Sequence, residues 1–534
     1  MFRNKSTVTI LIITTILFLI KWVLSFYYFK ESLSVRIIFE SVTDGWAYYP
    51  LIKYLAFFEF NNSFNPFIED LKIVLIPFSG IFIHSIFLKI FGYSAFIIVE
   101  FFAIFTFLLI FFKIFSHFFS ENESILLSLF LFSIPTVIVI LNITYLPYIN
   151  LLTDNFYTLR VPRPIISSLY LFAFLYLLIS MEMGKIFSKN KFIWAGIILG
   201  FSLTSFHYFF IIEATAFLFF LFYKLKFNFF GKILENKKYF LLLIIFFVVS
   251  ISPFFLNLHF HEKDFSERIG FTLLDYEKKK ILLGHYIHGY LKIEFLLFSL
   301  ASVLGVYFVN IKKILNYRLI NIFFILFLSC AFSPIIFILL SNKTIILYHF
   351  NNAIVVWGFL FSLIYLIVIV KHFFKIRLNI YVCRIFLTLI TFLYCLNTYL
   401  IKEKQFNDQF IKENRIEFQK ITKLINDNLA ISKSTIMTFN SQLMVWAVLN
   451  DVKYLSLTNF LIAPKTDEMI ENDLIKSFRF LNLNIHDFKY YLRNKKESWR
   501  YLNRNVATFF FYKYQANSLK TFNNSKNFDA EVAE

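Results

Sequence analysis

The sequence predicts an α-helical protein that crosses a membrane many times, and two observations carry this prediction. The first is composition: 58% of the 534 residues are hydrophobic and only 16% are charged, whereas soluble domains are about 45–50% apolar and about 25% charged. The second is the recurrence of apolar runs that approach the roughly 20 residues a helix needs to cross a bilayer. Both observations exclude an ordinary soluble enzyme, and we expect membrane lipid rather than nucleic acid as a partner.

Eleven apolar runs are predicted to form membrane spans. They lie at about 7–28, 93–112, 125–146, 166–183, 192–206, 208–223, 239–258, 294–311, 319–341, 352–370 and 385–401. The fifth and sixth runs form either two spans or one long helix, because only the polar break from Ser205 to Tyr208 separates them. The first run follows Arg3 and Lys5 and lacks a small-residue cleavage site, so it is interpreted as a retained signal anchor.

The loops between the predicted spans differ in charge. Four short loops are rich in Lys and Arg, which is typical of the cytosolic side of a membrane, and they share parity with the basic N-terminus: 184–191, 224–238, 312–318 and 371–384. The opposite loops are longer and mixed in charge: 29–92, 147–165, 259–293, 342–351 and the segment from 402. The pattern predicts a multi-pass protein of the cytoplasmic (inner) membrane with a cytosolic N-terminus and an outer, periplasmic C-terminus.

A change in composition near residue 401 divides the chain into two predicted domains. Residues 1–401 form the membrane domain, and residues 402–534 are predicted to form a small extracytoplasmic α/β domain. The second domain opens with an amphipathic helix at 404–428. The segments "STIMTF", "KYLSL" and "VATFFFY" are expected as strands between helices. This domain carries no P-loop, GxGxxG, CxxC or GxSxG, and a docking or acceptor-binding role without chemistry of its own is expected.

Asp44 is the most informative acid of the predicted outer side, in "ESVTDGWAYYPLIKYLAFFEF" directly after the first span. A carboxylate at the membrane edge can take a proton from an acceptor hydroxyl or hold a divalent cation against a pyrophosphate. The alternative is a solvated acid that only caps the helix beginning at Gly45 or Trp46. The residues after Asp44 are predicted to form an interfacial helix with aromatic side chains at headgroup depth. A second such helix is expected in "IEDLKIVLIPFSGIFIHSIFLKIFG".

The order of features after the first span resembles the GT-C superfamily of integral-membrane glycosyltransferases. An early acid, a helix of the form D-x-x-x-Y, a proline-containing helix ending in "IFG" and an aromatic entry to span two follow one another in "TDGWAYYPLIKYLA", "IPFSGIFIHSIFLKIFG" and "YSAFIIVEFFAIF". The resemblance covers about residues 8–112. It implies a polyprenyl-phosphate-linked sugar donor, an active site on the outer side, and a catalytic or metal-binding role for Asp44. The chain departs from related sequences at Glu100, where they often carry arginine, and at Gly45, where several carry a second acid.

Further residues of the predicted outer loops complete the candidate site. Arg160 and Arg163 precede span four, where guanidinium groups suit phosphate oxygens; snorkelling to lipid headgroups is the alternative. Asp154 resembles a second acidic position that some GT-C enzymes use to complete a metal site with the first, here for Mg or Mn. Four residues are substrate-binding candidates because of their place at the outer edge of a span: Tyr48, Tyr49, Lys343 and His349.

Other titratable residues have weaker patterns. His259 and His261 could share a zinc ion, but neither they nor the pair His285 and His288 comes with a full ligand set, so interfacial histidines are the simpler interpretation. The three cysteines show no metal or disulfide spacing. Glu100 lies within a predicted span, and we expect it to face a cation or a basic partner such as Arg160.

The leading functional prediction is a glycosyltransferase that moves a hexosyl or pentosyl group from a polyprenyl-phosphate-linked donor to an extracytoplasmic glycan, lipid or protein, with inversion by analogy. A flippase or transporter of lipid-linked oligosaccharides is the first alternative, although such proteins usually carry polar groups near mid-membrane and internal repeats. An O-antigen-type polymerase and a non-catalytic scaffold are the remaining alternatives.

Overall fold

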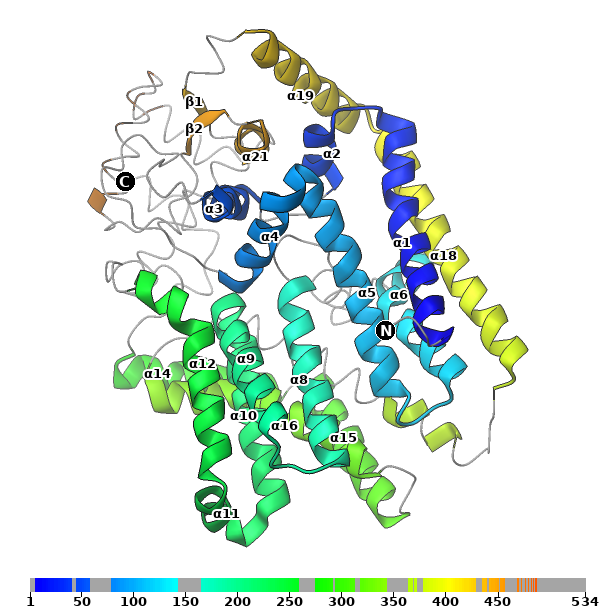
Figure 1. Cartoon of the computed structure of the whole chain (residues 1–534), viewed down its shortest axis with the longest axis vertical. Helices are drawn as coiled ribbons and strands as arrows, with labels where there is room; N and C mark the ends of the chain where they lie inside the picture. Colours follow the sequence, from blue (N-terminus) through cyan, green and yellow to red (C-terminus); the bar gives the residue numbers. More distant parts are fainter. Residues whose placement is uncertain are drawn as a thin grey trace.

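The computed structural model describes residues 5–40, 45–57, 78–142, 165–258, 274–291, 293–312, 317–342, 364–367, 369–371, 378–428, 435–438, 441–450 and 452–456, with isolated positions between 468 and 486. Helices dominate this part of the chain (Figure 1). The longer ones are α1 (Lys5–Phe29), α5 (Ala95–Phe115), α6 (Glu121–Ile140), α8 (Ile165–Met183), α9 (Lys189–Ser205), α10 (His207–Leu225), α12 (Lys237–Leu258), α14 (Tyr276–Tyr290), α15 (Ile293–Ile311), α16 (Tyr317–Ser341) and α18 (Ile380–Asn407).

The helices identify a multi-pass membrane protein, but with fewer clear spans than predicted. Six helical segments in the described residues are long and apolar enough to cross a membrane, and α14 with α15, bent by 66°, makes a seventh if the pair is one span. The count of eleven is therefore not supported, although every predicted run except 352–370 coincides with a described helix. Runs such as that of α9 form helices of only 17 residues, which is at the short limit for a bilayer.

The loop between α1 and α5 contains three helices: α2 (Leu33–Glu40), α3 (Gly45–Phe57) and α4 (Phe78–Phe91). The segment Phe78–Phe115 is continuous in helical character, yet α4 folds back on α5. The rings of Phe87 and Phe102 are 6.2 Å apart, whereas fifteen residues of straight helix would separate them by roughly 20 Å. Gly92, with φ of +59°, allows the reversal. The Ser85 hydroxyl donates to the Ile52 carbonyl at 2.8 Å and ties α4 to α3.

A close helix contact in the described bundle joins α9 to α12. A Cβ placed on Gly196 would lie 2.4 Å from the carbonyl oxygen of Leu243, and one on Gly200 would lie 2.5 Å from the Cβ of Ser250. The two glycines form a GxxxG motif, which lets helix backbones approach within van der Waals contact in a membrane. Packing of α8, α10 and α16 around this pair extends one continuous apolar core.

The two ends of the bundle have different characters. At one end lie the basic turn between α8 and α9 and the short helix α11 (Phe229–Glu235). Here the Lys191 ammonium of α9 donates to the Ser180 carbonyl of α8 at 2.6 Å. At the opposite end lie α2, α3 and the C-terminal elements (Figure 1).

The start of α6 is fixed by a capping box of Ser120 and Glu123, and Lys371 donates to Glu123 at 2.7 Å.

The C-terminal segment packs back on the first loop. It comprises α19 (Gln409–Asp427), β1 (Thr435–Thr438), α21 (Ser441–Leu449) and β2 (Lys453–Ser456). The two strands pair in parallel, at positions where strands were expected. Most of the chain after 456 lies outside the described residues, so the α/β domain stays a prediction. The ring of Trp446 in α21 is fully buried against residues of α2 and α3.

Candidate functional site

Most residues of the predicted site lie outside the described part of the chain. They are Asp44, Asp154, Arg160, Arg163, Lys343 and His349, together with His259 and His261. The flanks of Asp44 are described: α2 ends at Glu40 and α3 begins at Gly45. In the chain, this acid therefore stands between α2 and α3, and the C-terminal segment packs against α2.

Tyr48 and Tyr49 are the two predicted substrate-binding residues that the structure describes. Their side chains are buried, and the Tyr49 ring meets Phe96 of α5 edge-on with centroids 4.5 Å apart. Both belong to the apolar cluster that joins α3, α5 and α21. Their visible role is packing, which fixes α3 against the second span, and their contact with substrate stays a prediction.

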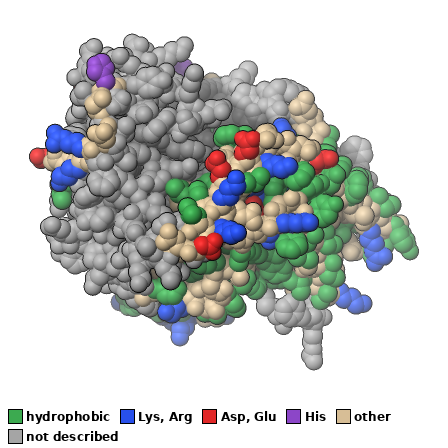
Figure 2. All heavy atoms as spheres, turned by 90° about the horizontal axis from the view of Figure 1, so that it is seen from above, with side chains coloured by type: hydrophobic (Ala, Val, Ile, Leu, Met, Phe, Trp, Pro, Cys, Tyr) green, Lys and Arg blue, Asp and Glu red, His purple; other side chains and the backbone are tan. Residues whose placement is uncertain are grey.

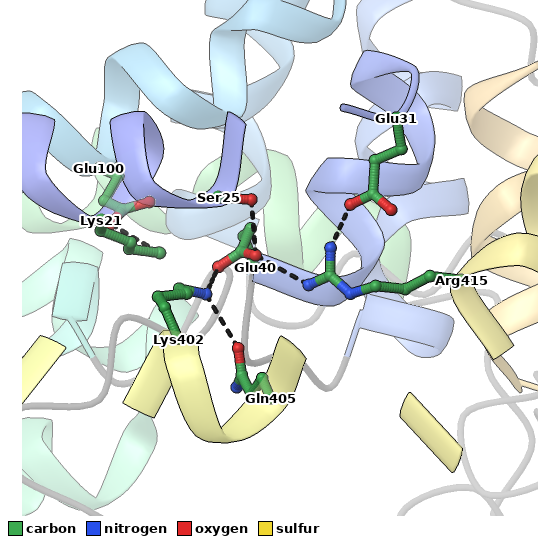
Figure 3. A network of polar contacts seen from close by, with 8 residues as sticks. All are labelled: Lys21, Ser25, Glu31, Glu40, Glu100, Lys402, Gln405 and Arg415. Carbon is green, nitrogen blue, oxygen red and sulfur yellow. Dashed lines mark hydrogen bonds and ion pairs between the residues drawn. The ribbon is translucent and has the colours of Figure 1, made fainter. Parts of the chain in front are cut away.

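The densest polar site in the described residues is a buried group of four charges, which we call the ionic cluster: Glu31, Glu40, Lys402 and Arg415. Glu40 lies between the two cations (Figure 3): the Lys402 ammonium donates to one of its carboxylate oxygens, and the Arg415 Nη2 donates to the other at 2.8 Å. Arg415 Nη1 donates to Glu31. Two acids and two bases balance in charge when all four are ionised, and at least 94% of each side chain is buried.

Neutral groups complete the surroundings of the ionic cluster. The Ser25 hydroxyl donates to Glu40 at 2.8 Å, and Lys402 also donates to Gln405 at 3.1 Å. The Arg415 guanidinium stacks between two rings, 3.6 Å from the centroid of Phe29 and 4.8 Å from that of Phe39. Arginine suits such a site because its planar group can stack and donate in a fork at once.

The two carboxyl groups of the ionic cluster titrate in opposite directions. Burial raises the pKa of Glu31 to about 7, in spite of Arg415, and the neighbouring Glu40 adds to the rise. Burial also acts on Glu40, but Lys402 and Arg415 outweigh it and hold the pKa of Glu40 below its ordinary value. Glu40 is therefore the carboxyl of the group that stays ionised to lower pH, whereas the pKa of Glu31 lies above its ordinary value.

A second ion pair adjoins the ionic cluster. Glu100 of α5 accepts from the Lys21 ammonium of α1 at 2.8 Å (Figure 3). The expectation that Glu100 meets a basic partner holds, and in the structure that partner is Lys21. An ion pair inside a membrane lowers the cost of both charges and joins the first two spans.

Glu213 is the other acid well inside a span. It is fully buried in α10, and its Oε1 accepts from the Ser202 hydroxyl of α9 at 2.9 Å. The contact joins two neighbouring helices within the apolar core. It thus has a structural partner rather than a visible path to water.

The described residues contain no group of three or more His, Cys, Asp or Glu side chains that could hold a metal ion. The predicted ligands Asp44 and Asp154 lie outside them. As carboxylates they match the oxygen ligands that Mg and Mn prefer. The cysteines within the described helices are free thiols.

Sequence reasoning missed the ionic cluster. Its acids come from residues 31 and 40, and its bases come from residues more than 360 positions later. One signal was available: Arg415 falls within the amphipathic helix on the same side as Phe418, where an exposed cation would not be expected. No family model and no curated protein matches this chain.

Proposed function

We propose that the chain is an integral-membrane glycosyltransferase of the GT-C type, which moves a sugar from a polyprenyl-phosphate-linked donor to an acceptor on the outer side of the membrane. One observation carries the proposal: the order of elements around Asp44. The first span is followed by α2 and then by this acid. After the acid come α3, α4 ending at Phe91, and the second span. The helical character of α3 and α4 supports the resemblance, since interfacial helices were expected at these positions.

The roles of the site residues follow from their chemistry. Asp44 acts as the base that activates the acceptor hydroxyl, or holds a divalent cation together with Asp154. Arg160 and Arg163 bind the leaving phosphate, whose negative charge grows in the transition state. Lys343 and His349 contact the lipid-linked donor.

The proposed orientation places the C-terminal segment outside and the N-terminus in the cytosol. The separation of short basic turns and C-terminal elements to opposite ends of the bundle supports this orientation (Figure 1). Viewed from the C-terminal end, Lys or Arg and Asp or Glu side chains are interspersed in the described residues (Figure 2). A surface of mixed sign there fits the outer side better than the cytosolic side.

The transporter alternative has less support among the described residues. A transport path needs polar groups that reach water near mid-membrane. Glu100 is paired with Lys21, and Glu213 accepts from Ser202 inside the apolar core. Both acids join helices, so neither favours a path for a polar substrate.

The decisive test is Asp44→Asn, which keeps the size of the side chain and removes its charge. Sugar transfer should fall by about 10²–10⁴-fold, because removal of a general base typically costs this much. The measurement uses purified membranes, a labelled polyprenyl-phosphate sugar and protein levels matched to the parent. The control is Asp427→Asn, the same change at an exposed position of α19, which should leave transfer unchanged.

An Asp44→Asn variant that transfers sugar at the parent rate would contradict the proposal. In that case, transfer of fluorescent lipid-linked oligosaccharide between the leaflets of a reconstituted vesicle distinguishes a flippase from a scaffold.

A further inference from the structure

The ionic cluster joins the two ends of the chain. Glu31 and Glu40 lie beside the first span, whereas Lys402 and Arg415 lie at the end of α18 and in α19. The contacts are direct and buried, so they fix the angle at which α19 leaves the last described span. Removal of one cation from such a buried group is costly, because Glu40 is then left buried with fewer partners.

The contact of α19 continues into α21. The indole Nε1 of Trp446 donates to the Thr422 hydroxyl, and Phe418 meets Phe39 edge-on with centroids 5.6 Å apart. Trp446 is fully buried, together with Ala447, against α2 and α3. Since α19 and α21 share these contacts, loss of the Arg415 ion pairs weakens the packing of both helices against α2 and α3.

We propose that the ionic cluster is a pH-dependent clasp, which holds α19 and α21 against α2 and α3 at mildly acidic pH and loosens as the pH rises through neutrality. Four groups face Glu31 in the docked state: Arg415 from α19, Lys402 from α18, and Arg36 and Glu40 from α2. From α1, the uncharged Ser25 contacts Glu40 and Phe29 contacts Arg415. The Lys21 ammonium of the same helix acts electrostatically on Glu40.

The direction follows from proton linkage. The pKa of Glu31 is about 7 when α19 is docked and 4.5 for the free side chain, so the docked state binds the proton more tightly. Its contribution to docking is complete below the lower value and is lost as the pH rises through the higher one. Glu40 acts in the opposite sense, because its pKa is lowered, and it weakens docking only in stronger acid. The ionic cluster therefore holds α19 most strongly at pH values between the titration of Glu40 and that of Glu31.

Thiol labelling of a buried position in α21 measures the opening directly. The three native cysteines of the full-length chain, Cys330, Cys383 and Cys395, are first replaced by alanine. Ala447→Cys is then introduced, and its rate of labelling by a maleimide is measured. The reference is the labelling rate of Lys423→Cys, an exposed position of α19. Dividing the labelling rate at position 447 by that at position 423 removes the general increase of thiol reactivity with pH. This ratio should rise about tenfold between about pH 6 and pH 8, the change that linkage gives for these two pKa values.

Three variants in this background test the assignment to the ionic cluster. Glu31→Gln mimics the protonated carboxyl, so labelling should stay slow with no dependence on pH. Arg415→Met should label fast throughout this range, and Lys420→Met, an exposed lysine of the same helix, should follow the parent. If Arg415→Met does not fold, the pH dependence of labelling in Glu31→Gln is sufficient to test the proposal.

A parent ratio that is constant with pH, or that falls as the pH rises, would overturn the proposal, as would a Glu31→Gln variant that keeps the parent slope. The readout is exposure of a thiol, so the clasp can fail or stand independently of the catalytic role proposed for Asp44.

Discussion

Two helix junctions in this protein are built from opposite chemistry. Between α9 and α12 the contact is apolar, and glycines bring the backbones together until no Cβ fits at Gly196. Between α1–α2 and α18–α19 the contact is ionic, with two carboxylates and two cations sealed among aromatic rings. In lipid, close packing of small residues stabilises helix pairs without a hydrophobic driving force. At the end of the bundle, buried charges give a junction that depends on its cations being in place.

The largest effect is expected from removing one cation of the ionic junction. Lys402→Met leaves Glu40 buried with Arg415 as its one remaining cation in the described cluster, and the free energy of unfolding should fall by about 3–5 kcal/mol. Chemical unfolding of the purified protein in detergent measures it. The control is Lys404→Met, two residues away on the exposed side of α18, which should stay within about 0.5 kcal/mol of the parent.

A loss below about 1 kcal/mol for Lys402→Met would mean that the ionic junction relaxes easily. The contrast with the glycine junction would then have no energetic basis.

A smaller loss is expected at the glycine junction. Gly196→Ala places a methyl group against the Leu243 carbonyl, and forcing the helices apart should cost about 1–3 kcal/mol. Gly284→Ala is the matched control, since a Cβ there meets nothing within 4 Å. This change should be neutral or stabilise by about 0.4–1 kcal/mol, because alanine restricts the unfolded chain. Equal effects of the two substitutions would contradict the close approach of α9 and α12.

The smallest effect is expected from an ion pair outside both junctions. Lys232 and Glu235 in α11 lie 2.6 Å apart, but their side chains are 44% and 56% exposed. Lys232→Met should change the unfolding free energy by less than about 0.5 kcal/mol, since water and salt screen exposed pairs. The same detergent unfolding assay applies, and a change comparable with that of Lys402→Met would show that burial does not set the strength of these pairs.

Periodic features of the sequence were predictable because they depend only on neighbouring residues. The apolar runs predicted α1, α5, α10 and α16 close to their observed bounds, and the amphipathic pattern predicted α19. Alternation predicted the strands that form β1 and β2. The described residues contain fewer clear spans than predicted, because hydropathy alone does not show where a helix ends, bends or folds back, as α4 does on α5.

Contacts between distant segments were decided by the tertiary structure. The sequence by itself determined a helical membrane protein, an acid in the loop after the first span and a basic distribution of short loops. It could not show that Tyr48 and Tyr49 turn into a core with Trp446, or that Arg415 meets Glu31 and Glu40. The physical reason is that burial and charge pairing depend on which helices meet in space, and residues 31 and 415 are brought together only when α19 docks on α2.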